Sequence, residues 1–162
     1  MEKRIVQVFV FIFLIILTGS TAFASSTTDQ IITTQIDAIN EISITGNPQA
    51  LLISDFTPGI EWMYKNDTNT SYAITTNETD RKITCEIDED MSTNTNLKVT
   101  LAAPTGWSRS LQVALSTTPA SLATGGPIAQ SGLLITWLFE ANTDAGIITE
   151  SQRTATFTIT SQ

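Results

Sequence analysis

The chain has 162 residues, a net charge of −8, a single cysteine and no histidine. A strongly acidic chain is a poor partner for nucleic acids and for anionic membrane surfaces, which attract Lys and Arg. The absence of histidine removes the commonest general base and the commonest metal ligand, so the composition argues against an enzyme and implies no cofactor.

The first 24 residues have the organisation of a secretory signal peptide. Lys3 and Arg4 precede a run of apolar residues, and Ala22 and Ala24 flank Phe23 in a small-x-small cleavage pattern. The apolar run is shorter than the roughly 20 residues of a membrane-spanning helix. We expect residues 1–24 to be removed, although an uncleaved N-terminal anchor is the alternative. The sequence therefore predicts a secreted, periplasmic or cell-surface protein that meets the membrane only through this transient segment.

Residues 25–162 are enough for one domain with a sizeable core, and their 6 basic and 15 acidic residues give a net charge of −9. Residues 32–45 begin it with an alternating pattern, in which the even positions are mostly apolar and the odd positions mostly polar. Because side chains alternate between the two faces of a strand, this run predicts a long half-buried strand, or two strands with a break near Asn40.

Further alternating runs follow along the chain. A turn at Asn47 and Pro48 leads to a short apolar run at residues 51–53, and residues 61–69 read as a loop with a short strand inside it. The regular runs that come next cover residues 71–76, 82–87, 97–102, 111–115, 133–139 and 154–160. The first two read as a hairpin. The Gly- and Pro-containing residues 117–132 read as a long connection.

Short strands separated by turn residues, with no convincing helix, predict an all-β fold: an antiparallel, immunoglobulin-like β-sandwich of about seven to eight strands. Thr-rich strands suit a pleated surface that is half exposed to water. The predicted core consists of Ile36, Ile42, Ile44, Ile74, Ile83, Ile87, Leu97, Val99, Leu101, Val113, Leu115, Ile135, Trp137, Phe157 and Ile159.

Few residues suggest a metal site or a nucleophile. Cys85 alternates with Ile83 and Ile87, which indicates a buried thiol, with an intermolecular disulfide or a reactive thiol as the alternatives. Asp88 and Asp90 are weak candidates for a calcium site, because Ca²⁺ prefers several oxygen ligands from one short loop. Their spacing does not match a known calcium loop, so a solvated acidic turn is the favoured interpretation and no metal is assigned.

Three aromatic residues are candidates for facing a ligand. Trp62 and Tyr64 lie in the irregular run, and Trp107 follows Gly106 in a loop. An aromatic side chain at the surface can stack on a sugar ring, but the favoured interpretation is that each one covers an end of the sandwich. These residues support a glycan- or protein-binding β-sandwich module as one functional hypothesis.

Two segments resemble bacterial fimbrial-type subunits. Residues 38–46, Ala-Ile-Asn-Glu-Ile-Ser-Ile-Thr-Gly, and the following Leu51-Leu52-Ile53 are similar to the N-terminal region of such subunits. Residues 153–160, Arg-Thr-Ala-Thr-Phe-Thr-Ile-Thr, resemble their final strand. The chain lacks the cysteine pair that many of these subunits have, and its last three residues, Thr160, Ser161 and Gln162, do not include the aromatic residue that is common at the tail of such subunits.

The resemblance implies a structural surface subunit that polymerises by donating its N-terminal strand to a neighbour, so that partners are copies of itself or other surface proteins. Ile32, Ile36, Ile42 and Ile44 are then the candidate strand-donor residues. The competing interpretation is that this segment pairs within its own chain, which is the usual outcome for a strand followed by a short turn.

Overall fold

The computed structural model describes residues 28–55 and 57–162, and its regular structure is almost entirely β-strand. One turn of 3₁₀-helix, Thr143–Ala145, is the exception within these residues. The strands are β1 (Asn40–Thr45), β2 (Trp62–Thr76), β3 (Arg81–Ile87), β4 (Thr95–Leu101), β5 (Ser108–Arg109), β6 (Val113–Ala114), β7 (Ala120–Gly125), β8 (Ile128–Asn142) and β9 (Ala155–Ser161).

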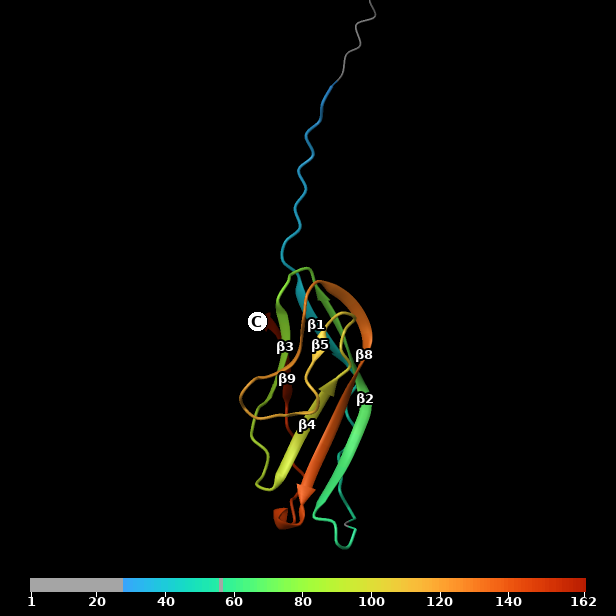
Figure 1. The fold of residues 1–162 in the computed structure, drawn as a ribbon, viewed down its shortest axis with the longest axis vertical. Coiled ribbons are helices and arrows are strands. Elements are labelled where there is room, and N and C mark those ends of the chain that lie inside the picture. The colour runs from blue at the N-terminus through green and yellow to red at the C-terminus, as the bar shows by residue number, and fades with distance from the viewer. Residues whose placement is uncertain (1–27, 56) are drawn as a thin grey trace, which may run out of the picture. The chain divides into compact units, whose positions relative to one another are not determined.

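The strands form two antiparallel sheets that pack face to face (Figure 1). The five-stranded sheet has the order β1-β2-β8-β4-β6, and the four-stranded sheet has the order β5-β7-β3-β9. The predicted antiparallel β-sandwich is therefore confirmed. Nine strands are described where about seven to eight were expected, and the two that the alternating runs did not predict are the two-residue β5 and the six-residue β7.

The long central strands β2 and β8 pair over their whole lengths, and this pairing corrects the sequence analysis at residues 61–69. Residues 62–69 belong to β2 and do not form a loop. The register shifts between Asp67 and Thr70, so one extra residue interrupts the alternation. A β-bulge of this kind changes which residues face the core, and this is why the pattern looked irregular.

The predicted hairpin between residues 71–76 and 82–87 is wrong. β2 belongs to the five-stranded sheet and β3 to the four-stranded sheet, so the turn between them carries the chain across the sandwich. Asp80 has a φ of 54° in this turn, and its carbonyl accepts a hydrogen bond from the Gln162 N–H at 2.9 Å. Alternation alone cannot distinguish the two arrangements, because each strand has one apolar face in either case.

Residues 111–132 also differ from the expectation. The predicted long connection contains β7, which pairs with β3, and it includes the start of β8. The predicted strand at residues 111–115 is reduced to β6, and Leu111 is exposed. The glycines near residue 125 suggested a loop, but Gly125 ends a strand where a ring packs directly on its backbone.

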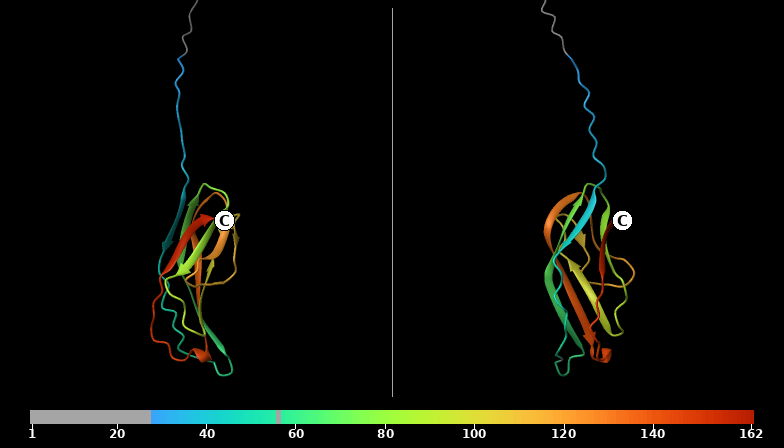
Figure 2. Two further views of the ribbon diagram at one scale, coloured as in Figure 1. Left: turned by 90° about the vertical axis from the view of Figure 1, so that its left-hand side faces the viewer. Right: turned by 180° about the vertical axis from the view of Figure 1, so that it is seen from behind.

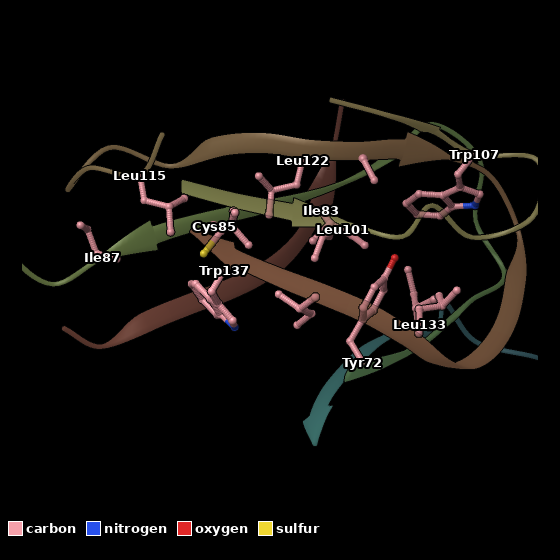
Figure 3. Close-up of a cluster of buried hydrophobic side chains, with 14 residues drawn as sticks. Tyr72, Ile83, Cys85, Ile87, Leu101, Trp107, Leu115, Leu122, Leu133 and Trp137 are labelled. Carbon is pink, nitrogen blue, oxygen red and sulfur yellow. The ribbon is translucent and has the colours of Figure 1, made fainter. Parts of the chain in front are cut away.

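The core lies between the two sheets (Figure 3). Trp137 of β8 and Phe157 of β9 meet edge to face, with ring centroids 6.0 Å apart, and the Trp137 indole N–H donates to the Thr70 hydroxyl at 3.2 Å. The buried apolar residues of this cluster are Tyr72, Ile74, Ile83, Cys85, Ile87, Val99, Leu101, Trp107, Leu115, Leu122, Ala123, Leu133, Ile135 and Trp137.

Most of the predicted core is confirmed, but its N-terminal part is not. Ile36 is 83% exposed, Ile44 is 40% exposed, and Ile42 is only partly buried. Val113, Phe157 and other predicted members are also partly buried, and they pack against the edge of the cluster. The strand predicted for residues 32–45 begins only at Asn40, so the first part of the alternating run has no sheet to cover.

Replacing Ile135 by Asp should unfold the sandwich. Ile135 has no exposed surface, and an unpaired carboxylate in its place would be buried among apolar side chains. The matched control is Leu134→Asp, because Leu134 is the neighbouring residue on the same strand and is 53% exposed. Circular-dichroism melts should show loss of the cooperative transition for Ile135→Asp alone. Equal melting of both variants would contradict the assignment of the two faces of β8.

Candidate functional site

Residues 28–39, called here the N-terminal arm, contain no regular secondary structure. Three isoleucines of the arm are strongly exposed: Ile31 at 93%, Ile32 at 77% and Ile36 at 83%. Exposed isoleucines so close together are unusual, because large apolar side chains are normally buried. Of the four candidate strand-donor residues, Ile32 and Ile36 are thus accessible.

The other two candidate donor residues lie in β1, which pairs with β2 of the same chain. Ile42 lies opposite Ile74, and Ile44 lies opposite Tyr72. In this structure the intramolecular pairing that competed with donation is the one adopted by residues 40–45. Ile42 is partly buried and the other five residues of β1 are exposed, so this edge strand covers the core but is only shallowly embedded itself.

The side chain of Asn77 connects the end of the arm to the turn after β2. Its Oδ1 accepts a hydrogen bond from the Ile39 N–H at 2.8 Å, and its Nδ2 donates to the Asp37 carbonyl at 2.8 Å. The Asn77 N–H also donates to the Ile39 carbonyl at 3.2 Å. The Asn77 side chain thus provides the acceptor and the donor that a neighbouring strand would otherwise offer to the backbone of residues 37 and 39.

A second polar cluster fixes the first residue of β1. The Thr76 hydroxyl donates to Asn40 Oδ1 at 2.7 Å, and Asn40 Nδ2 donates to the Glu78 carboxylate. Glu78 also forms an ion pair with Arg81 at 2.6 Å. The hydrogen bond from Asn40, together with the charge of Arg81, lowers the pKa of Glu78. These contacts specify the register of β1, and the apolar pattern of the strand gave no indication of them.

The segment between β1 and β2, residues 46–61, begins with a tight approach to the neighbouring strand. Gly46 has a φ of +83°, and a Cβ built on it would lie 2.6 Å from the Asn69 carbonyl oxygen. Both features require glycine at this position. Leu51 packs against the core, so part of the segment is anchored to the sandwich.

Trp62 and Tyr64 share the outer face of β2. Trp62 is 42% exposed and Tyr64 is 72% exposed. Glu140 of β8 lies directly opposite Tyr64 in the register, and its carboxylate forms an ion pair with Lys98 of β4 at 2.7 Å. Two accessible rings beside charged hydrogen-bonding groups are a suitable surface for stacking and polar contacts with a ligand.

Trp107 does not belong to this surface. Its side chain is 8% exposed, its indole N–H donates to the Gly126 carbonyl at 3.0 Å, and its ring packs on Gly125. A Cβ on Gly125 would lie 2.3 Å from the ring, so the missing side chain makes room for the indole. Trp107 covers one end of the core, at the opposite end from Leu115 (Figure 3), and it is not positioned to face a ligand.

The acidic residues after β3 organise loops. Asp88 Oδ1 accepts a hydrogen bond from the Thr154 N–H at 2.9 Å, and Asp90 Oδ1 accepts one from the Thr117 N–H at 2.8 Å. The hydrogen bond from Thr154 lowers the pKa of Asp88. Within residues 28–55 and 57–162, no group of three His, Cys, Asp or Glu side chains could hold a metal ion.

The thiol of Cys85 is buried in the core, as the alternation predicted. Burial, with a smaller contribution from the charge of Glu86, raises the pKa of Cys85 to about 12. Since thiolates are the reactive form, the thiol is a poor nucleophile at neutral pH. Burial also raises the pKa of Tyr72 to about 12, and the Tyr72 hydroxyl donates a hydrogen bond to the Ala102 carbonyl at 2.6 Å.

Comparison with protein-family models, curated proteins and solved structures finds no match to this chain. None of the helical structure in the described part of the chain has the length and apolar character needed to cross a membrane.

The site residues that sequence reasoning missed are Asn40, Asn77 and Glu140. Polar residues at strand ends and on outer faces carry no periodic signal, so only the pairing of the strands identifies them.

Alkaline pH should destabilise the fold. The folded-state pKa values of Cys85 and Tyr72 lie near 12, above their ordinary values of 9.0 and 10.0, so the stability they contribute is fully present below about pH 9 and is lost as pH rises toward 12. Urea unfolding at a series of pH values measures this loss. Tyr72→Phe should show a shallower decline above pH 10, relative to its own value at pH 8. Identical declines would contradict the role of Tyr72.

Proposed function

We propose that the chain is a non-catalytic, secreted or cell-surface structural subunit that assembles with copies of itself through its N-terminal strand region. The observation that carries this proposal is the exposure of Ile32 and Ile36 just before an edge strand. Burying an isoleucine is worth about 1.5–3 kcal/mol relative to leaving it exposed. The arm therefore retains a substantial apolar driving force that the folded single chain does not use.

Strand pairing supplies the specificity that this driving force lacks. A strand added to a sheet forms backbone hydrogen bonds along its length, and its alternate side chains fix the register. The arm and β1 together provide an alternating pattern of apolar and polar residues in one continuous segment. Copies of the chain, or other surface proteins with a similar sheet edge, are the partners that this chemistry suits.

The chemistry of the described residues supports a structural role over catalysis. The chain contains no histidine, the thiol of Cys85 is buried, and Asp88 and Asp90 are hydrogen-bonded within loops. Secretion rests on residues 1–24, which lie outside the described residues, and it remains an expectation from the sequence. The net charge of −9 on residues 25–162 favours solubility of such a subunit before it assembles.

The outer face of β2 favours a second candidate function, binding of a glycan or a protein. Trp62 and Tyr64 are accessible on this face, and the ion pair between Glu140 and Lys98 lies beside them. Aromatic rings stack on the apolar faces of sugars, and charged side chains hydrogen-bond to hydroxyl groups. A subunit that assembles and a module that binds can therefore be the same protein.

Removing residues 25–35 should abolish assembly and leave a folded monomer. This deletion retains Asp37 and Ile39, whose backbone groups bind Asn77, and it retains all of β1. Size-exclusion chromatography with light scattering measures assembly, and circular dichroism measures folding. The double substitution Ile32→Ser and Ile36→Ser should have the same effect, whereas Thr33→Ser serves as the control. Assembly that survives both the deletion and the double substitution contradicts the proposed function.

Glycan binding should change the fluorescence of Trp62 specifically. The full chain is titrated with a panel of soluble oligosaccharides, and the emission is compared with that of Trp62→Ala and Tyr64→Ala. Trp107 and Trp137 are buried, so their emission provides an internal background that a surface ligand leaves unchanged. A ligand-dependent shift that persists in Trp62→Ala would place the binding surface elsewhere.

A further inference from the structure

The first half of β2 is an open edge of the five-stranded sheet. β1 pairs with β2 only along residues 71–76, whereas β8 pairs with it from Trp62 onward. On the side away from β8, no strand of the described part of the chain therefore pairs with residues 62–69. In Figures 1 and 2 this stretch runs along the margin of the sheet, with β8 beside it on one side only. Unpaired backbone groups of this kind are a template for adding another strand.

A hydrogen bond at the start of β2 shows which residues have free backbone groups. The Thr143 N–H donates to the Glu61 carbonyl at 3.1 Å, so the backbone of Glu61 faces β8. This direction alternates along a strand, so the odd-numbered residues that follow also bond to β8 as far as the bulge. Trp62, Tyr64 and Asn66 therefore direct their N–H and C=O groups outward.

The other pairings of β8 agree with this assignment. The Asn142 N–H donates to the Asn94 carbonyl at 3.1 Å, and the Leu134 carbonyl accepts a hydrogen bond from the Ala102 N–H at 2.8 Å. The even-numbered residues of β8 thus face β4. Its odd-numbered residues face β2, and they lie opposite the odd-numbered residues of β2 before the bulge. The even-numbered residues of this stretch are therefore the ones whose backbone groups are available to a ligand.

The same three residues of β2 present their side chains on the outer face of the sheet. Trp62 is 42% exposed, Tyr64 is 72% exposed, and Asn66 is exposed as well. Residues of an added antiparallel strand that lie opposite them would be about 5.5 Å away between Cα atoms, with their side chains beside the two rings. A lysine or arginine in such a position would contact the face of an aromatic ring, which attracts cations.

The charges around the open edge favour a positively charged partner. Glu61 and Asp67 lie at the two ends of the stretch, and Asp144 follows the end of β8. Lys65 is the only basic residue between them. The charged residues of the N-terminal arm are all acidic, so charge complementarity disfavours the arm of another copy as the added strand. The edge is thus better suited to a basic segment of a different protein.

We propose that the open edge of β2 at Trp62, Tyr64 and Asn66 binds an extended, positively charged segment of another protein as an added strand. This proposal rests on the second candidate function, because it names the partner of the outer face of β2. Backbone hydrogen bonds hold the segment, and Lys or Arg at alternate positions contacts the two rings. The intervening residues of the segment are apolar and face the partly buried Met63.

A heptapeptide of alternating arginine and valine is the probe that tests this proposal. Its fluorescent derivative should bind the full chain in an anisotropy titration, whereas a heptapeptide of alternating glutamate and valine should not. Two further arginine–valine peptides have the same charge and number of methyl groups, one with N-methylation at the arginines, whose amides face β2, and one with N-methylation at internal valines. Methylation at the arginines should abolish binding, because it removes the donors to β2, and methylation at the valines should preserve it.

Two substitutions of Tyr64 separate the role of the backbone from that of the ring. Tyr64→Pro removes an N–H that faces away from β8, so the pairing of β2 with β8 is retained, and peptide binding should weaken about tenfold because an edge hydrogen bond is lost. Tyr64→Ala retains this N–H and should weaken binding less. Circular dichroism checks that both variants fold.

Amide hydrogen exchange measured by NMR locates the peptide on the unmodified chain. The amides of Trp62, Tyr64 and Asn66 should exchange quickly in the free protein, whereas those of Met63 and Lys65 should exchange slowly, because their N–H groups bond to β8. The arginine–valine peptide should slow exchange at the first three residues. This measurement tests the proposal even where Tyr64→Pro fails to fold.

Three results would overturn the proposal. The first is no binding of the arginine–valine peptide. The second is equal binding of the two methylated peptides without protection of the three outward amides, since charge alone would then hold the peptide. The third is preferential binding of a peptide with the sequence of residues 28–39 at this edge, which would make another copy the partner. The oligosaccharide titration of Trp62 does not depend on strand addition, so a fluorescence shift there without peptide binding leaves the second candidate function standing, and failure of both tests removes it.

Discussion

The sandwich depends on covering the edge of its five-stranded sheet, where β2 presents Tyr72, Ile74 and Thr76 to the core. These three side chains are almost completely buried, although they lie only one strand from the margin of the sheet. β1 provides the cover, yet most of its own residues are exposed. The core therefore needs a strand in this position, although that strand is itself held by few buried contacts. This asymmetry underlies both the stability of the monomer and the assembly proposed for it.

Polar contacts give this shallow strand a defined register. A shift of one residue would turn Ile42 and Ile44 toward solvent and bring Glu41 and Ser43 over the core. The apolar contacts oppose such a shift only weakly, because Ile44 is 40% exposed. The hydrogen bonds of Asn40 with Thr76 and Glu78 oppose it strongly, since a shifted strand would leave these groups unpaired. Register at this edge is thus encoded mainly by hydrogen bonds.

The sequence predicted the fold class well because alternation reports directly on the two faces of a strand. Ile135 and Ile36 illustrate where this reasoning ends: both occupy the apolar face of an alternating run, but the first has no exposed surface and the second is 83% exposed. Alternation identifies a face, and only the pairing of strands decides whether a second sheet covers it. The first half of β2 was read as a loop for a related reason, because the bulge between Asp67 and Thr70 reverses the alternation within the strand.

The candidate site was predictable only in part, because its residues depend on contacts that are distant in sequence. Ile32 and Ile36 were found from their pattern, and Trp62 and Tyr64 from their residue type. Trp107 was a candidate for facing a ligand because a loop tryptophan next to Gly106 can be exposed, but it adopts the other position considered, at an end of the core, where Gly125 of β7 makes room for its ring. No pattern in the sequence around Trp107 or Gly125 indicates that the ring of one packs where the other has no side chain.

The two proposed surfaces occupy different parts of β2, and this separation has a functional consequence. β1 pairs with residues 71–76, in the second half of the strand, whereas Trp62 and Tyr64 lie near its beginning. A copy that assembles through its N-terminal strand region, as proposed above, would therefore keep its aromatic residues accessible. Since β8 pairs with β2 along both parts, it holds the two surfaces in a fixed relation within each copy. Assembly of this kind would then repeat the aromatic surface once per subunit, which raises the avidity for a repetitive ligand without any new contact.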